Sequence, residues 1–334
     1  MESVSALVII TVFLALVFDF INGFHDAGNS IATIVTTKVL TPRQAVLWAA
    51  FFNFCAFMVF NLSVARTIGE GLIDAQYMEP HLILSALVGA IAWNLLTWFL
   101  GLPSSSSHAL IGGLAGAAVA KAGWNVLIPS GFLKVLIGIL AAPVLGIFVG
   151  MITMSWLTSL YEGHNQRKAQ KHFKRFQLLS SAFLSLTHGG NDAQKTMGVI
   201  TILLFSSGHL TGAFYIPFWI ILTCQGVISL GTLFGGWRVI RTMGTKITIL
   251  NPMRGCAAET AAAMLLFVAT ESGIPMSTTQ TVTGSIAGVG LLNGMKSVNW
   301  PVMTKIFTAW MLTIPAAGSL SAGMMMFGEL FKFC

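Results

Sequence analysis

Two aspartates lie inside apolar stretches of the chain, in short polar clusters of related sequence. Asp26 belongs to NGFHDAGNS (22–30), and Asp192 belongs to HGGNDAQKT (188–196), 166 residues further along. A carboxylate at membrane depth costs at least ~2.5 kcal/mol, so a matching pair indicates a function. Binding a sodium ion or a proton is the chemistry that fits these two groups. The plainer alternative is that each buried aspartate caps the helix that follows it and pairs with a His or Lys.

Two further polar clusters consist of hydroxyl residues that follow a Gly-x-Pro sequence. They read GLPSSSSH (101–108) and GIPMSTTQ (273–280). Each run is predicted to open a new helix, whose backbone N–H groups and positive dipole end would face a bound anion. Such a site suits phosphate or sulfate. In the plainer alternative, these hydroxyls only bond to helix carbonyls or hold helices together.

The candidate ligands combine these hydroxyls with nearby amide and charged groups. The predicted anion ligands are Asn29, Ser105, Ser106, Ser107, Gln194, Lys195, Ser277, Thr278, Thr279 and Gln280. The predicted cation ligands, with sodium as the ion at the two aspartates, are Asp26, Asp192, Asn29, Ser105 and Ser277. Lys195 takes the position of Asn29 in the other cluster, where it contacts the anion or pairs with Asp192. Two aspartates and a divalent phosphate, less Lys195, leave about three negative charges, so about two or three monovalent cations would neutralise them.

Three more residues are candidates for coupling or gating: His25, His108 and Glu259. Histidines beside polar clusters either carry protons or serve as hydrogen-bonded scaffold, and His188 beside Asp192 has the same two interpretations. Glu259 fits a gate, a cation ligand or an anchor at the membrane surface.

The composition places these clusters in a membrane. Of 334 residues, 55% are hydrophobic and 9% are charged, whereas soluble domains carry about 25% charged residues. A soluble enzyme and a disordered protein are therefore excluded. The net charge of +7 does not indicate nucleic-acid binding, because the basic residues lie in short connectors between apolar runs. The four cysteines are scattered and indicate neither a disulfide framework nor a metal site.

The apolar runs predict an all-α polytopic membrane protein. A membrane span needs about 20 apolar residues, and charge-free runs of that length or longer cover 44–65, 82–120, 135–161, 196–237 and 306–328. Shorter runs cover 4–18, 176–191 and 272–295. The N-terminal run is predicted to be a first helix and not a signal peptide, since no basic region precedes it. All four polar clusters are predicted to interrupt helices, which a bilayer tolerates only where the backbone is buried in protein or lines a cavity.

The chain also repeats itself. GLPSSSSHALIGGLAG (101–116) aligns without gaps with GIPMSTTQTVTGSIAG (273–288), at an offset of 172 close to the offset of 166 between the aspartates. This predicts a duplication, with halves at 1–161 and 176–334 and a basic connector at 162–175. The connectors at 37–43, 161–175, 238–254 and 296–305 hold 13 of the 18 Lys and Arg residues, so they are predicted to be cytoplasmic. One Ser/Thr-tipped hairpin then enters from each side, which makes the halves inverted, a pattern typical of secondary transporters.

Five segments resemble the inorganic phosphate transporter (PiT) family, and the resemblance spans nearly the whole chain. They read NGFHDAGNSIAT (22–33), GLPSSSSHALIGG (101–113), HGGNDAQKTMG (188–198), CAAETAAA (256–263) and GIPMSTTQTVTG (273–284). The resemblance implies cation-coupled phosphate import, two inverted halves and a homodimer, with phosphate held by residues 105–107 and 277–279 and cations by Asp26 and Asp192. It implies no cofactor beyond the coupling ions.

The sequence departs from that family at two positions. His25 precedes Asp26 where many members have Asn, and Gln280 stands where many have His, so the coupling ion stays open between sodium, which is favoured, and a proton. The short connector indicates a prokaryotic form in the cell (inner) membrane, with lipid as its surroundings and no nucleic-acid partner.

Three alternatives to a phosphate symporter remain at this point. A sulfate permease would use the same ligands. A passive anion channel has little use for two intramembrane aspartates, which would repel the anion. A hydrolase built on Ser107 and His108 is disfavoured, because adjacent side chains on one helix point in different directions and no nucleophile elbow is present. The sequence therefore predicts a transporter with alternating access and not an enzyme.

Overall fold

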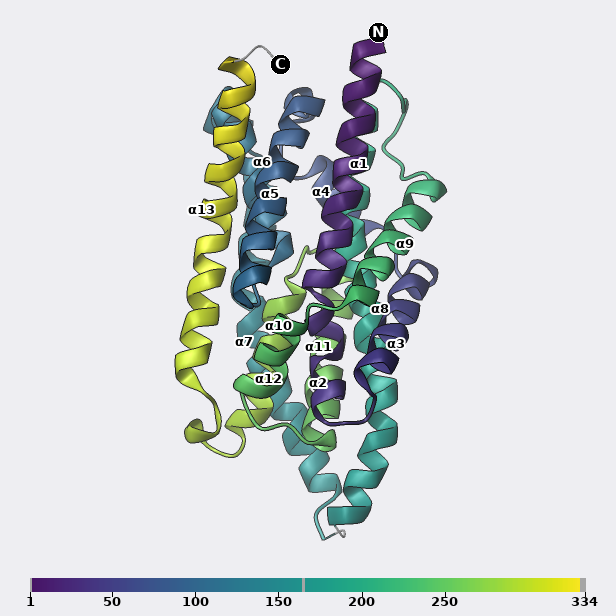
Figure 1. The fold of residues 1–334 in the computed structure, drawn as a ribbon, viewed down its shortest axis with the longest axis vertical. Helices are drawn as coiled ribbons and strands as arrows, with labels where there is room; N and C mark the ends of the chain where they lie inside the picture. Colours follow the sequence, from purple (N-terminus) through teal and green to yellow (C-terminus); the bar gives the residue numbers. More distant parts are fainter. Residues whose placement is uncertain (1, 164–165, 331–334) are drawn as a thin grey trace.

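The protein is described by a computed structural model that covers residues 2–163 and 166–330. These residues form helices and contain no β-strand, only an isolated bridge between Ile73 and Leu127. The α-helices, shown in Figure 1, are α1 (Glu2–His25), α2 (Ala27–Thr36), α3 (Pro42–Cys55), α4 (Ser63–Glu70), α5 (Pro80–Leu100), α6 (Ser106–Ala122), α7 (Pro129–Leu160), α8 (Gln166–Ser206), α9 (Phe218–Phe234), α10 (Trp237–Arg241), α11 (Pro252–Glu271), α12 (Thr278–Leu291) and α13 (Trp300–Leu330).

The predicted fold class, an all-α polytopic membrane protein, is confirmed. Five helices in the described residues are long and apolar enough to cross a membrane, and two bent helix pairs raise the number to seven. Large apolar side chains such as Phe13, Leu133 and Phe148 lie exposed on the outside of the bundle. Such a surface is stable against lipid and not against water.

The helix interruptions agree with the sequence at three of the four polar clusters. The first break is a single residue, Asp26, between α1 and α2, while the Ser/Thr clusters separate α5 from α6 and α11 from α12. The prediction for the third cluster is wrong, because α8 runs unbroken through residues 188–196. Its glycines serve close packing instead: a Cβ atom on Gly189 would lie 2.6 Å from the Asn53 carbonyl oxygen of α3. The helix keeps its hydrogen bonds, and the missing side chains let a neighbouring helix approach.

The elements of the first half recur in the second half. The α5–α6 hairpin corresponds to α11–α12, and the bent pair α3–α4 (80°) corresponds to α9–α10 (65°). The long helices α7 and α13 each contain one internal proline, Pro143 and Pro315. In Figure 1, α5 and α6 occupy the upper part of the molecule and α11 and α12 the lower part, with the hairpin tips near mid-height.

Each half covers the hairpin of the other half. Helix α13 packs along α6, and α7 packs along α12. Matching glycines allow this contact: a Cβ atom on Gly112 would lie 2.6 Å from the Ile314 carbonyl oxygen, and one on Gly284 would lie 2.6 Å from that of Pro143. Small residues at the crossing are the usual means of close helix packing in lipid. The repeated glycines therefore determine how the halves interlock.

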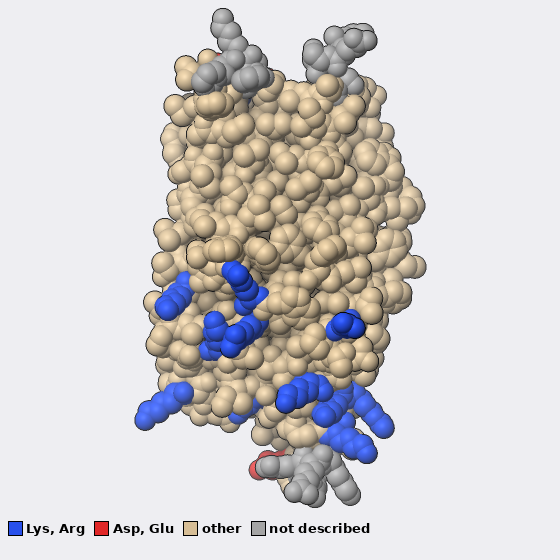
Figure 2. Space-filling model, in the orientation of Figure 1, with Lys and Arg blue, Asp and Glu red and all other residues tan. Residues whose placement is uncertain are grey.

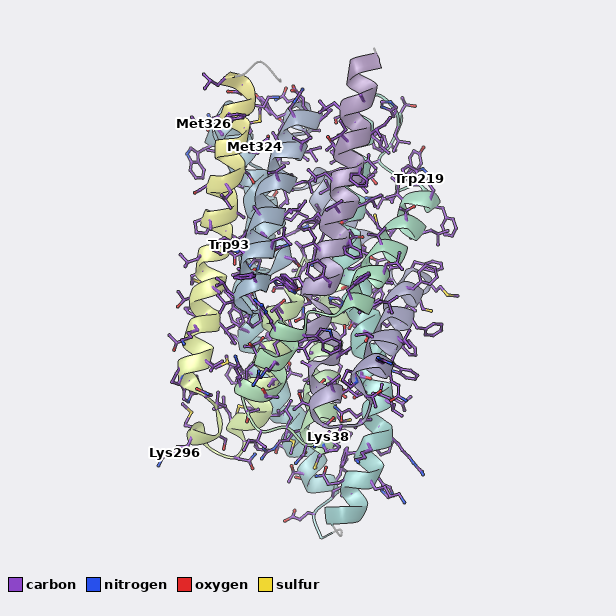
Figure 3. All side chains as sticks on the ribbon, viewed as in Figure 1. Lys38, Trp93, Trp219, Lys296, Met324 and Met326 are labelled. Carbon is purple, nitrogen blue, oxygen red and sulfur yellow. The ribbon has the colours of Figure 1, made fainter. Side chains whose placement is uncertain are left out.

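Basic residues gather at one end of the molecule. Figure 2 shows Lys and Arg side chains on the lower part of the visible face and none on its upper part. Figure 3 places Lys38 and Lys296, from two of the basic connectors, at the lower end. This distribution agrees with the predicted clustering of the connectors on one side. Lys332 and Cys334 lie outside the described residues.

Candidate functional site

The two hairpin tips have the same helix cap. Ser105 is the N-cap of α6, and its hydroxyl accepts the backbone N–H of His108 at 3.2 Å. Ser277 is the N-cap of α12 and accepts the N–H of Gln280 at 3.3 Å. Serine is a favoured N-cap because its oxygen satisfies an otherwise unpaired N–H. The serine hydroxyl at each cap is thus occupied within its own helix. The hydroxyls of the next two residues, Ser106 and Ser107 at the first tip and Thr278 and Thr279 at the second, contact other elements.

Asp26, at the break between α1 and α2, is bound by both hairpins. Ser106 Oγ donates to Asp26 Oδ2 at 2.6 Å and lies 2.7 Å from Asn22 Oδ1. Thr279 Oγ1 lies 3.5 Å from Asp26 Oδ1, and His25 Nδ1 lies 2.6 Å from the same oxygen. The Asp26 carboxylate makes no capping hydrogen bond to α2. Helix capping therefore does not explain this buried charge.

Asp192 and Lys195 form an ion pair on one face of α8. Lys195 Nζ lies 2.5 Å from Asp192 Oδ1, and Thr278 Oγ1 lies 3.1 Å from Asp192 Oδ2. Lys195 also reaches both hairpin tips, donating to Ser107 Oγ at 2.5 Å and to the Met276 carbonyl at 3.4 Å. A residue in mid-helix has no free backbone N–H to cap, so Asp192 has no capping role. One ammonium group thus connects α8 with both halves of the molecule.

His188 places one ring nitrogen beside Asp192 in this cluster. Its Nδ1 lies 3.3 Å from Asn53 Oδ1, while the amide nitrogen of Asn53 donates to Thr232. An amide oxygen only accepts, so His188 Nδ1 carries a proton. The other ring nitrogen, Nε2, lies 3.2 Å from Asp192 Oδ2. Asp26, His188 and Asp192 each offer a possible ligand atom within 4.8 Å of the others, so the three groups could hold a metal ion together.

The convergence is closed to solvent. Asp26 and Lys195 are each 1% exposed, and Asp192 is fully buried. Asn29 from α2 joins them by donating its amide to Thr278 Oγ1 at 3.1 Å and Thr279 Oγ1 at 3.0 Å. We call this group of residues from α1, α2, α8 and both hairpin tips the central site. Its carboxylates suit a cation, and its hydroxyl, amide and ammonium donors suit an anion.

Other predicted residues have different neighbours. Gln194 Oε1 accepts the backbone N–H groups of Val64 at 3.1 Å and Ala65 at 3.2 Å, and its Nε2 donates to the Asn61 carbonyl at 2.7 Å. This side chain therefore joins α8 to the start of α4, and its amide is already occupied. His108 is buried, and neither ring nitrogen has a hydrogen-bond partner among the described residues. In Gln280, also buried, the side-chain oxygen likewise lacks a partner within the described chain.

Glu259 belongs to a separate buried cluster. Thr33 Oγ1 donates to Glu259 Oε1 at 2.5 Å, Gln177 Nε2 donates to the same oxygen at 2.8 Å, and Ser180 donates to Oε2. All four side chains are buried, so an anchor at the membrane surface does not describe Glu259. This cluster joins α11 to α2 and α8 away from the hairpin tips.

Sequence reasoning missed two polar residues of α1. Asn22 shares Ser106 with Asp26, and Asp19 Oδ1 accepts the hydroxyl of Thr196 at 2.9 Å. Asn22 lies four residues before Asp26 and therefore on the same helix face, which is the signal that identifies it. Asp19 is a third acidic residue in an apolar helix, a signal of the same kind as Asp26.

Comparisons with known proteins agree with this architecture. A family model described as the phosphate transporter family matches residues 22–162 and 158–321. A protein of Rhizobium meliloti (strain 1021), named a probable low-affinity inorganic phosphate transporter, is 52% identical over 309 residues, which cover 92% of each chain. A protein of Bacillus subtilis (strain 168) with the same name is 43% identical over 324 residues, covering 96% of this chain and 97% of that protein.

A solved structure named "The sodium-dependent phosphate transporter" has a TM-score of 0.87 and 27% identity, covering 97% of this chain and 99% of that one. The prediction that the chain is not an enzyme is confirmed, because the family and these relatives are transporters. The hydrolase alternative also lacks its Ser–His contact, since Ser107 Oγ is bonded to Lys195. The chain belongs to the phosphate transporter family.

Proposed function

We propose that this protein is a secondary active transporter that imports inorganic phosphate together with sodium ions by alternating access. The observation that supports this most strongly is the meeting of both hairpin tips with Asp26, Asp192 and Lys195 in a closed, buried site. The solved structure with a TM-score of 0.87 carries sodium dependence in its name.

The central site divides into cation and anion ligands. Asp26 and Asp192, with His188 Nε2 as a third ligand when that nitrogen is unprotonated, would hold sodium, since the three groups offer ligand atoms within 4.8 Å of one another. The hydroxyls of Ser106, Ser107, Thr278 and Thr279, with Asn29 and Lys195, would hold phosphate. Gln194 is left out because the backbone of α4 already occupies its amide.

Charge explains why transport would be coupled. A phosphate dianion beside two carboxylates and one ammonium group carries a large net negative charge in a buried site, and this arrangement is unstable unless cations enter with it. Sodium would therefore be required for phosphate to bind, and phosphate would stabilise bound sodium in return. A leak of either ion alone is then disfavoured.

The duplication would supply alternating access. The proposed halves, 1–161 and 176–334 joined by the connector 162–175, would be inverted repeats, with the basic end in the cytoplasm and the protein in the cell (inner) membrane. One hairpin would then open the central site to each side of the membrane. The homodimer that the resemblance implies is part of this proposal.

Uptake of radiolabelled phosphate into proteoliposomes tests the function. Sodium and proton gradients are imposed separately, with excess sulfate as competitor. We expect uptake driven by sodium and resistant to sulfate. Uptake driven only by protons would contradict sodium coupling and point to His25 and His108, strong competition would favour a sulfate permease, and flux without a gradient would indicate an anion channel.

A further inference from the structure

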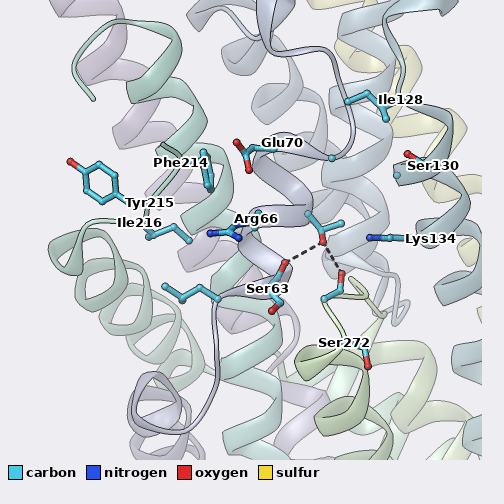
Figure 4. Close-up of a pocket in the computed structure, with 15 residues that line it drawn as sticks. Ser63, Arg66, Glu70, Ile128, Ser130, Lys134, Phe214, Tyr215, Ile216 and Ser272 are labelled. Carbon is cyan, nitrogen blue, oxygen red and sulfur yellow. Dashed lines mark hydrogen bonds between the residues drawn. The ribbon is translucent and has the colours of Figure 1, made fainter. Parts of the chain in front are cut away.

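A basic cavity lies outside the central site. It has a volume of about 800 Å³ and lies between α4, the first turns of α7, residues 214–216 before α9, and Ser272 and Gly273 at the second hairpin tip. Figure 4 shows Arg66 of α4 and Lys134 of α7 in its wall. In Figure 1, α4 lies in the upper part of the molecule, away from the basic connectors.

The two basic residues of this cavity differ from most other Lys and Arg residues of the chain in their position. Five of the 18 Lys and Arg residues lie outside the basic connectors. Lys195 is paired with Asp192, Lys121 is paired with Glu79, and Lys332 lies outside the described residues. The other two, Arg66 and Lys134, both line the cavity, are exposed, and have no ion-pair partner in the described chain.

The remaining lining groups leave the cavity with a positive balance. Glu70, one turn after Arg66, is the single carboxylate among the lining residues, so two positive groups face one negative group. Hydroxyls of Ser63, Ser130 and Ser272 add hydrogen-bond donors. Arginine is suited to bidentate binding of phosphate oxygens, and lysine acts as a point charge.

A short segment separates this cavity from the central site. On the cavity side, Thr67 Oγ1 donates to the Gly273 carbonyl at 2.8 Å. On the other side, the Met276 carbonyl lies 3.4 Å from Lys195 Nζ. Residues 273–276, the extended tip before α12, are thus in contact with the cavity wall at one end and with the central site at the other.

The repeat does not account for the basic character of the cavity. Lys134 corresponds to Ile306 of α13 at the offset of 172, and the neighbouring Lys305 lines an apolar groove of about 400 Å³ with Trp93, Leu96 and Leu100. The hydrophobic lining there offers little to an anion. The basic cavity is therefore a feature of one hairpin only.

We propose that the basic cavity is an entry vestibule in which Arg66 and Lys134 bind inorganic phosphate before it passes the segment 273–276. This inference rests on the proposed function and adds a second phosphate site to it. A concave basic surface raises the local concentration of an anion and speeds its association, an effect that salt weakens.

Replacing Lys134 by cysteine allows the charge to be changed in the assembled protein. Lys134→Cys is reconstituted into zwitterionic vesicles and treated with a methanethiosulfonate reagent bearing either a sulfonate or an ammonium group. We expect the sulfonate to raise the KM for phosphate about five- to tenfold from the cavity side only, with kcat unchanged, and the ammonium group to restore the KM. Lys305→Cys is the matched control, and treated wild-type protein measures reaction at the native cysteines.

Protection of the new thiol tests binding without transport. Inorganic phosphate is expected to slow modification of Cys introduced at position 134 and not at position 305, and Arg66→Gln is expected to remove this protection. The vestibule would be overturned by equal KM values for both charge states. It would also be overturned if anionic lipid, added to a second set of vesicles, protected the thiol and inorganic phosphate did not. Wild-type protein that shows no uptake would contradict the proposed function, whereas normal uptake without protection would contradict only the vestibule.

Discussion

The tips of the two hairpins have the same backbone conformation at their glycine and one hydrogen bond in common. Gly101 and Gly273 have left-handed φ angles of 65° and 67°, where glycine is favoured. In each case a threonine from the bent helix pair of the other half donates to the glycine carbonyl: Thr242 to Gly101 at 3.0 Å, and Thr67 to Gly273 at 2.8 Å. This part of each tip is the same in the two segments that align at the offset of 172.

The other anchors differ. At the first tip, Trp310 Nε1 of α13 donates to the Pro103 carbonyl at 2.9 Å, and Ser104 is bonded to Thr97 at 2.7 Å. At the second tip, the α7 residue beside the Pro275 carbonyl is Gly138, which has no side chain to donate. In this segment of the second tip, the Met276 carbonyl accepts Lys195 Nζ at 3.4 Å, and the tip borders the basic cavity. We expect the second tip to open more readily than the first, because fewer hydrogen bonds hold its extended segment 273–276 than hold 101–104.

The largest effect is expected from the charge that links the two tips. Asp192→Asn leaves Lys195 buried without its partner, and breaking such a pair by removing one member costs about 3–5 kcal/mol. We expect sodium-coupled uptake to fall more than about 100-fold in proteoliposomes. Asp74→Asn, an exposed carboxylate beside Gln76, is the control. Normal uptake by a monodisperse Asp192→Asn protein would contradict the cation assignment.

Removing one hydroxyl from each tip compares their roles in binding. Ser106 lies 2.6 Å from Asp26, and Thr278 lies 3.1 Å from Asp192. We expect Ser106→Ala and Thr278→Ala each to raise the KM for phosphate about tenfold, with the larger effect at Ser106, since each leaves a buried group short of a donor. Ser319→Ala, on the exposed face of α13, is the control. Unchanged KM values in both variants would indicate that backbone N–H groups hold the anion.

Trp310→Phe tests whether the indole holds the first tip. The substitution leaves the Pro103 carbonyl without its donor, which costs about 1–3 kcal/mol for a buried group. We expect faster amide hydrogen exchange in residues 101–108 and little change in 273–280. Trp93→Phe is the control, since Trp93 donates to Thr313 and to neither tip. Equal exchange in wild type and Trp310→Phe would remove the main difference between the tips.

The smallest effect is expected at the anchor that both tips share. Thr67→Val and Thr242→Val each remove one hydrogen bond of about 0.5–1.5 kcal/mol with little change of shape. We expect Thr67→Val to increase hydrogen exchange at its tip more than Thr242→Val does, because Trp310 still holds the first tip. The reverse order would show that the first tip is the weaker one.

The sequence predicted features that depend on local chemistry. Long apolar runs can only be stable helices in lipid, glycine and proline end helices, and serine caps the next one, so the helical fold and both hairpins followed from residue types alone. The duplication was visible because glycines such as Gly112 and Gly284 are retained wherever a neighbouring backbone approaches closely. Asp26 and Asp192 stood out because an intramembrane carboxylate is costly.

The tertiary structure decided which groups meet. Whether the glycines of residues 188–196 break α8 or admit α3 depends on the neighbour, and the contact with Asn53 resolves this in favour of packing. Tertiary packing likewise decided that Gln194 binds the backbone of α4 and that Glu259 lies in a buried cluster with Thr33. It also formed the basic cavity, which combines Arg66 and Lys134 from separate helices. Local sequence sets the shape of each element, but contacts between side chains far apart along the chain are fixed only when the helices pack.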